Sequence, residues 1–286
     1  MKRKIVVAAI QFEIKPLDID VNLSKIEMLI ADLCKERCDL IVLPEDCITG
    51  PDYYPTPEPQ DESSKSIKLL KQLAIKYQIY LVCGSFTKKV GKKLFSTSLL
   101  INPKGGIILE YQKNNLWHPE RPYLAKGNNI QVVKTPIGTI GIIICWDLAF
   151  PEICRKLIKM GADIICCPSY WTVDDSRMLH KKYGKLTEHI FVNTLCPARA
   201  IENEVLFIYA NGAGTAKMNL KTIVWKAPQI GQSQICVPIL GTVIKMESNN
   251  EGYITYEYDR QLANDAEKTY KIRQDINSIP ASNPNF

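Results

Sequence analysis

The sequence predicts an α/β protein with mixed sheets, and three patterns lead to this prediction. Short runs rich in Val and Ile alternate with longer segments of helical period, as in layered α/β proteins. Several runs are apolar at consecutive positions, as at residues 140–144, which is typical of strands buried on both faces. Residues 79–111 contain strand patterns separated by turn residues without an intervening helix, and this indicates antiparallel neighbours.

The individual elements follow from the same patterns. The apolar runs predict strands at residues 5–11, 40–44, 79–86, 94–102, 107–111, 130–135, 139–145, 163–168, 205–210 and 253–258. The helical period predicts helices at residues 22–36, 62–77, 151–160, much of 177–202, and 260–274. The proline-rich segment 51–61 is too short to separate two domains and is predicted to be a surface loop. We expect one domain over residues 1–275 and a C-terminal tail over residues 276–286.

Composition and charge exclude several classes of protein. With 46% hydrophobic and 23% charged residues, the 286-residue chain does not resemble a disordered, collagen-like or coiled-coil protein. The net charge of +6 is spread along the chain, so a nucleic-acid partner is not expected. The apolar run that follows the basic first residues is too short for a signal peptide, and no stretch approaches the roughly 20 apolar residues of a membrane span.

Ten cysteines and three histidines form no metal-binding pattern. No C-x-x-C motif occurs, and Cys166 and Cys167 are adjacent, which fits neither a zinc site nor a secreted disulfide framework. Most of these thiols are expected to be buried and reduced. We therefore expect a cytoplasmic protein without a metal ion or another cofactor.

Cys145 is the first candidate for chemistry. The buried strand predicted at 139–145 ends at this cysteine, and Pro151 suits the first turn of the helix that follows. A cysteine in such a corner has its sulfur near backbone N–H groups, which favour a thiolate. A cysteine considered alone is more often a buried core thiol, so both interpretations stand at this point.

Two charged residues follow other predicted strands in the same way. Glu45 follows the strand at 40–44, and Lys113 follows the strand at 107–111. Ligands of α/β sheets bind beyond the carboxyl ends of the strands, so Glu45, Lys113 and Cys145 are predicted to converge there. One charged residue after a strand is usually only a solvated loop residue, but the set of three favours a catalytic site.

Glu45, Lys113 and Cys145 with their surroundings resemble the Glu-Lys-Cys triad of the nitrilase superfamily, and the resemblance covers almost the whole chain. The matching segments are 43–45, 111–116, 145–147, 150–152 and 161–163, with weaker matches at 198–203, 211–212 and 231–241. The resemblance implies a four-layer αββα sandwich that commonly assembles as a homodimer or a higher homo-oligomer through its helical outer layer. It also implies cysteine-dependent hydrolysis of a non-peptide C–N bond through a thioester.

The resemblance implies a role for each residue. Glu45 is the base for Cys145 and later the proton donor to the leaving amine, and Lys113 with the backbone N–H of Trp146 stabilises the oxyanion. Glu120 is the candidate for a second glutamate that orients Lys113 or the substrate, with a surface acid paired to Arg121 as the alternative. Asn115 departs from the family, which often has a histidine two residues after the lysine.

The expected substrate is a small-molecule amide or carbamoyl compound. Asp147 favours these over nitriles, because family members acting on nitriles tend to have a glutamate there. Leu148 and Ala149 stand where an arginine often binds a substrate carboxylate, so an uncharged or aromatic substrate is predicted. Trp146, Tyr170 and Trp171 are its candidate binding residues, although Tyr170 and Trp171 fit the core edge equally well. A nitrilase, an acyltransferase and a non-catalytic family member remain the alternatives.

Overall fold

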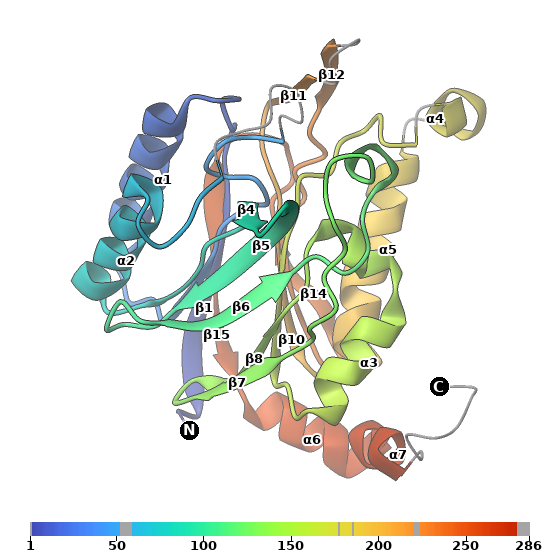
Figure 1. Cartoon of the computed structure of the whole chain (residues 1–286). Coiled ribbons are helices and arrows are strands. Elements are labelled where there is room, and N and C mark those ends of the chain that lie inside the picture. Colours follow the sequence, from blue (N-terminus) through green and yellow to red (C-terminus); the bar gives the residue numbers. More distant parts are fainter. Residues whose placement is uncertain (1, 52–58, 177, 185, 220–223, 279–286) are drawn as a thin grey trace.

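Two face-to-face sheets form the centre of the computed structural model, which describes residues 2–51, 59–176, 178–184, 186–219 and 224–278 (Figure 1). The first sheet has the order β15-β1-β2-β3-β5-β4, with β6 paired to β5, and the second has the order β14-β13-β10-β9-β8-β7. The first comprises β1 (Lys4–Gln11), β2 (Leu40–Val42), β3 (Tyr80–Val82), β4 (Phe86–Val90), β5 (Lys93–Ile101), β6 (Ile107–Gln112) and β15 (Gly252–Asp259). The second comprises β7 (Val132–Thr135), β8 (Gly138–Ile142), β9 (Ile164–Pro168), β10 (Leu206–Ala210), β13 (Gln234–Val237) and β14 (Gly241–Lys245).

Both sheets are mixed, as predicted. β2 pairs in parallel with β1 and β3, and β9 pairs in parallel with β8 and β10, whereas the pairs β1–β15, β5–β6, β7–β8 and β10–β13 are antiparallel. The parallel strands therefore lie in the middle of each sheet. Their consecutive apolar residues reflect this position, since both faces of such a strand are covered.

Helices cover the outer face of each sheet (Figure 1). α1 (Ile19–Leu33) and α2 (Lys65–Tyr77) cover the first sheet, and α3 (Pro151–Lys159) and α5 (Thr187–Ile201) cover the second. Val7 and Ala9 of β1 pack into the core between the sheets, whereas Ala8 and Ile10 pack against the α1–α2 side. The alternation follows from the two-residue period of a strand. The four-layer αββα prediction is confirmed.

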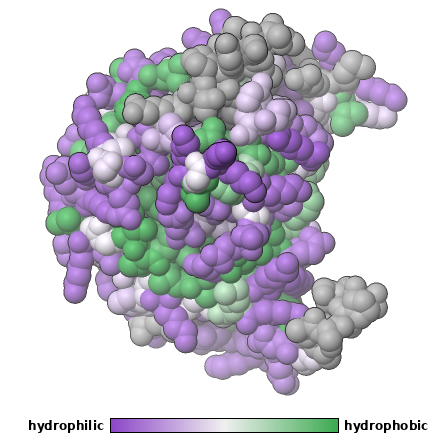
Figure 2. Space-filling model, viewed as in Figure 1, coloured by the Kyte–Doolittle hydropathy of each residue, from purple (hydrophilic) through white to green (hydrophobic). Residues whose placement is uncertain are grey.

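Smaller elements complete the described part of the chain. They are the 3-10 turns η1 (His118–Glu120) and η2 (Cys145–Ala149), the hairpin of β11 (Thr215–Asn219) and β12 (Val224–Pro228), and the helices α4 (Met178–Tyr183), α6 (Gln261–Tyr270) and α7 (Ile272–Ser278). The boundary expected between residues 275 and 276 falls inside α7, and most of the proline-rich loop lies outside the described residues. Figure 2 shows that hydrophilic side chains cover most of one face of the molecule.

Several predicted elements are divided or shorter than expected. The strand predicted at 79–86 is interrupted at Gly84, where φ is +57° and a Cβ atom would lie 1.9 Å from the carbonyl oxygen of Pro44. The interruption thus comes from close contact with the segment that carries Glu45. The strand predicted to reach Cys145 ends at Ile142, and the helical region 177–202 contains two helices. Strands β11 to β14 were not predicted, because their polar and turn-forming residues hide the strand pattern.

Candidate active site

Cys145 begins the η2 turn that joins β8 to α3. Its φ of +46° lies in the left-handed region that residues other than glycine rarely adopt. The residue is 9% exposed and lines a cavity. The corner predicted from the sequence is therefore present, with a strained backbone at the cysteine itself.

Lys113 connects the charged residues of the cavity. It follows β6 directly, and its side chain is 1% exposed. Its Nζ atom donates hydrogen bonds to Glu45 Oε1 at 2.8 Å and to Glu120 Oε1 at 2.6 Å. Glu45, which follows β2, is 2% exposed, and its backbone N–H donates to the carbonyl of Ser169. Cys145, Glu45, Lys113 and Glu120 all line the same cavity.

Glu120 is buried beside Lys113, not placed on the surface beside Arg121. It ends the η1 turn, and its Oε2 atom accepts a hydrogen bond from the backbone N–H of Trp117 at 2.7 Å. The guanidinium of Arg121 instead donates to the carbonyl of Leu116. Each carboxylate oxygen of Glu120 thus has a fixed partner, which holds the lysine in one position.

Burial and charge set the protonation of these groups. Burial opposes the positive charge of Lys113, but the carboxylates of Glu120 and Glu45 outweigh it and hold the Lys113 pKa well above its usual value. Burial and the nearby Glu45 raise the pKa of Cys145 well above the usual value for a thiol, although Lys113 opposes them. The sequence analysis expected both a corner that favours a thiolate and a thiol that gives its proton to Glu45, and the raised pKa of Cys145 favours the second.

Asp147 ties the lysine segment to the cysteine turn. Its Oδ1 atom accepts from the backbone N–H of Asn115 at 2.8 Å and from Asn115 Nδ2 at 3.1 Å. Its Oδ2 atom accepts from the hydroxyl of Tyr111 at 2.7 Å and from the backbone N–H of Ile144 at 3.1 Å. Asp147 is fully buried, so it positions the site through local bonds. Asn115, the departure from the family pattern, is part of this network.

The three aromatic candidates line the same cavity as Cys145. Trp146 stacks on Phe191 with ring centroids 6.0 Å apart, and Trp171 lies 5.7 Å from Trp146. Trp171 is 2% exposed, and its indole N–H donates to Glu188 at 2.6 Å. Tyr170 and Trp171 belong to the hydrophobic core as well. Both sequence interpretations therefore hold: these side chains pack the core and border the cavity.

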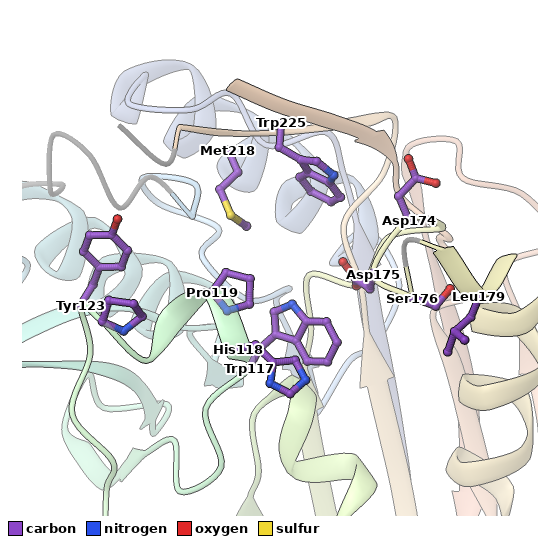
Figure 3. A pocket seen from close by; sticks show the side chains of 11 residues that line it. Trp117, His118, Pro119, Tyr123, Asp174, Asp175, Ser176, Leu179, Met218 and Trp225 are labelled. Carbon is purple, nitrogen blue, oxygen red and sulfur yellow. The ribbon is translucent and has the colours of Figure 1, made fainter. Parts of the chain in front are cut away.

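The cavity consists of an inner and an outer chamber. The inner chamber at Cys145 has a volume of about 30 Å³, and the outer chamber has a volume of about 650 Å³. Figure 3 shows the outer chamber. Its lining residues are Trp117, His118, Pro119, Pro122, Tyr123, Asp174, Asp175, Ser176, Leu179, Met218 and Trp225.

Four of the residues that the structure describes line both chambers and were not predicted. They are Trp117, Asp175, Met218 and Trp225, and the last two come from the β11–β12 hairpin. Asp46, which lines the inner chamber, was also missed, although its place next to Glu45 was a possible signal.

Two further properties concern the described part of the chain. No group of three or more His, Cys, Asp or Glu side chains there is arranged to hold a metal ion. Among its helices, none is both long enough and apolar enough to cross a membrane.

Comparison with known proteins gives consistent matches over nearly the full length. The carbon-nitrogen hydrolase family model matches residues 6–268. A probable nitrilase of Schizosaccharomyces pombe is 28% identical, with 92% of each chain covered. The 2-oxoglutaramate amidase of Bacillus subtilis is also 28% identical, with 94% of this chain and 96% of the relative covered.

Solved structures share the fold. Nit3 of Saccharomyces cerevisiae, a member of branch 10 of the nitrilase superfamily, superposes with a TM-score of 0.77 at 24% identity, covering 100% of this chain and 97% of its own. A carbon-nitrogen hydrolase from Helicobacter pylori gives a TM-score of 0.82 at 21% identity, with 95% of each chain covered.

Proposed function

This chain belongs to the carbon-nitrogen hydrolase family, and we propose that Cys145, Glu45, Lys113 and Glu120 carry out its C–N bond hydrolysis. One observation supports the proposal most strongly. The ammonium of Lys113 is buried and bonded to both glutamates, in a cavity that Cys145 also lines. A buried lysine between two carboxylates is costly to build, and such groups cluster at active sites.

The chemistry begins with the Cys145 thiol. Its raised pKa means that Glu45 takes the proton as the sulfur attacks the substrate carbon. Lys113 and the backbone N–H of Trp146 stabilise the negative oxygen of the tetrahedral intermediate. Glu45 then passes the proton to the leaving nitrogen, and a thioester remains on Cys145. Water activated by Glu45 hydrolyses the thioester and releases the carboxylic acid.

The two chambers support a primary amide or a carbamoyl group as the reacting end of the substrate. The chamber beside Cys145, with a volume of about 30 Å³, is much smaller than the outer chamber, which favours a small leaving group such as ammonia. The larger acyl part would occupy the outer chamber. Names among the relatives, including 2-oxoglutaramate amidase, also favour an amide. Asp147 is enclosed in its own network and contributes only indirectly.

Ammonia release from a panel of primary amides, N-carbamoyl compounds and nitriles tests this function. Cys145→Ala is expected to lower kcat/KM at least about a thousandfold, because the covalent step is lost. Cys154→Ala is the matched control, since Cys154 is a fully buried thiol on α3 outside the cavity. If Cys145→Ala retained the wild-type rate, the assignment of the nucleophile would be wrong.

We also propose that a second copy of this chain packs on the outer face of α5. This face exposes Leu186, Ile190 and Ile201, and the neighbouring loop adds Ile239 and Leu240. The loop lies against α5, because a Cβ atom at Gly241 would be 3.6 Å from Ile201. Exposed apolar side chains on one outer helix suit a two-fold interface. Light scattering should give a dimer for the wild type and a monomer for Ile190→Glu; a wild-type monomer would exclude this proposal.

We also propose that the hydrolase domain covers residues 1–275 and that the protein acts in the cytoplasm. All ten cysteines are free thiols, which supports a reducing compartment. Cell fractionation that located the protein in an oxidising compartment would contradict the cytoplasmic location.

A stable, active protein truncated after residue 268, where the family match ends, would contradict the proposed domain boundary at residue 275.

A further inference from the structure

Asp175 lines both the inner and the outer chamber, and Figure 3 shows it in the lining of the outer one. Its Oδ2 atom accepts from the backbone N–H of Thr172 at 2.9 Å, and its Oδ1 atom accepts from the Thr172 hydroxyl at 2.8 Å. Both donors are neutral. In the described part of the chain, no Lys or Arg side chain forms an ion pair with Asp175. The carboxylate is thus fixed in position, and its charge has no protein counter-charge there.

The inner chamber contains more acidic than basic groups. Among the described residues that line it are the carboxyl side chains of Glu45, Asp46, Glu120 and Asp175, and the one ammonium among them is that of Lys113. Lys113 is already bonded to Glu45 and Glu120. Among the described residues that line the outer chamber there is no Lys or Arg. A carboxylate on the acyl part of a substrate would therefore meet acidic side chains and, among the described lining residues, no cationic side chain free to pair with it.

Aromatic side chains line the two chambers together with Asp175. Trp117 and Trp225 line both chambers with it, and Figure 3 shows these three side chains in the lining of the outer chamber. Met218 completes the set. Indole faces attract ammonium groups through their negative π surface and also cover methylene chains. A carboxylate with two tryptophans therefore suits an alkyl chain that ends in a cation.

We propose that Asp175 is a specificity-determining residue that binds an ammonium group on the acyl part of the substrate, with Trp117 and Trp225 covering the connecting chain. The preferred substrate class is then a primary amide with an amino group at its far end. The inference rests on the proposed hydrolytic function, and it replaces the uncharged or aromatic substrate expected from the sequence with a cationic one. Hydrolysis would give the amino acid and ammonia.

Three amides of equal chain length test the charge preference directly. They are 5-aminopentanamide, hexanamide and adipamate, which carry four methylenes and end in an ammonium, a methyl group and a carboxylate. For the wild type, kcat/KM should be at least tenfold higher for 5-aminopentanamide than for hexanamide, and lowest for adipamate. Asp175→Asn keeps the shape of the side chain and should bring the first ratio down to within about threefold of one, mainly through KM.

Asp174→Asn is the matched control, because Asp174 is the adjacent residue and lines only the outer chamber. It should change the ratio less than Asp175→Asn does. A wild-type preference for adipamate, an unchanged ratio in Asp175→Asn, or an equal loss in Asp174→Asn would each overturn the assignment.

Calorimetric binding to the Cys145→Ala protein separates this inference from the proposed function. Tighter binding of 5-aminopentanamide than of adipamate, lost in the Cys145→Ala, Asp175→Asn double variant, supports the inference even if no amide is hydrolysed. Equal or tighter binding of adipamate refutes it, even if hydrolysis depends on Cys145.

Discussion

Asp147→Asn tests whether a buried carboxylate holds the lysine segment against the cysteine turn. Four donors point at the two oxygens of Asp147: the Tyr111 hydroxyl, the backbone N–H groups of Ile144 and Asn115, and the Asn115 side chain. Asparagine keeps the shape but replaces one oxygen with an NH2 group. In either orientation, that NH2 faces a backbone N–H that can no longer be satisfied.

The structure gives the size of the effect. A buried donor without a partner costs about 1–3 kcal/mol, and the remaining bonds weaken because their acceptor is no longer charged. Burial raises the pKa of Asp147, which means that the buried charge is itself unfavourable. The neutral asparagine avoids this desolvation cost, and this offsets part of the destabilisation. We expect a net loss of about 2–3 kcal/mol in the free energy of unfolding. kcat should fall as well, because Lys113 is two residues from Asn115.

Urea denaturation measures this loss, and a double-mutant cycle with Tyr111→Phe assigns it. Tyr111→Phe should cost about 1 kcal/mol less in the Asp147→Asn background than in the wild type, because its carboxylate partner is already gone. The matched control is Asp32→Asn, since Asp32 accepts from the hydroxyl of Tyr253 at 2.9 Å on the surface. That control should cost less than about 0.5 kcal/mol. A similarly small effect of Asp147→Asn, or no coupling to Tyr111, would refute the reasoning.

Three further predictions concern charge. Glu120→Gln should lower kcat about tenfold or more, because Lys113 loses an anionic partner. In the Cys145→Ala background, the same change should alter the affinity for the amide only a few-fold. An unchanged kcat would exclude a positioning role for Glu120. Burial and the neighbouring Glu267 raise the pKa of Glu204 to about 7. Because the folded state binds this proton more tightly than the unfolded state does, the contribution of Glu204 to stability is greatest below pH 4.5 and is lost as the pH rises through 7. Glu204→Gln should therefore flatten the fall in the free energy of unfolding between pH 5 and pH 8. An unaltered slope would count against this prediction. Burial, opposed by the Thr172 bonds and reinforced by Glu188 and Glu45, raises the pKa of Asp175 to about 7. The kcat/KM ratio of 5-aminopentanamide to hexanamide should thus rise up to about tenfold from pH 6 to pH 8, and a ratio that is constant with pH would contradict this.

The sequence by itself determined the layered architecture and the three central residues. Alternating apolar patterns are local, and burial on both faces leaves consecutive apolar residues in β2 and β9. Glu45 and Cys145 follow strands of this kind, β2 and β8, and Lys113 follows the antiparallel strand β6, so the position of each could be predicted along the chain. Ligands of α/β sheets bind beyond the carboxyl ends of parallel strands, which is why local patterns sufficed to predict that Glu45 and Cys145 belong to the site.

Only the tertiary structure decided how these residues are held and charged. Glu120 acquires its contact with Lys113 from a turn that buries it, and Asp147 acquires its bonds from residues as far away as Tyr111. Only the raised pKa of Cys145 distinguished the two expectations for its proton, because a pKa depends on burial and on charges brought from other strands. Asp175 borders the cavity with Trp225, which is fifty residues further along the chain. Such contacts have no local pattern, since they are fixed by packing between elements.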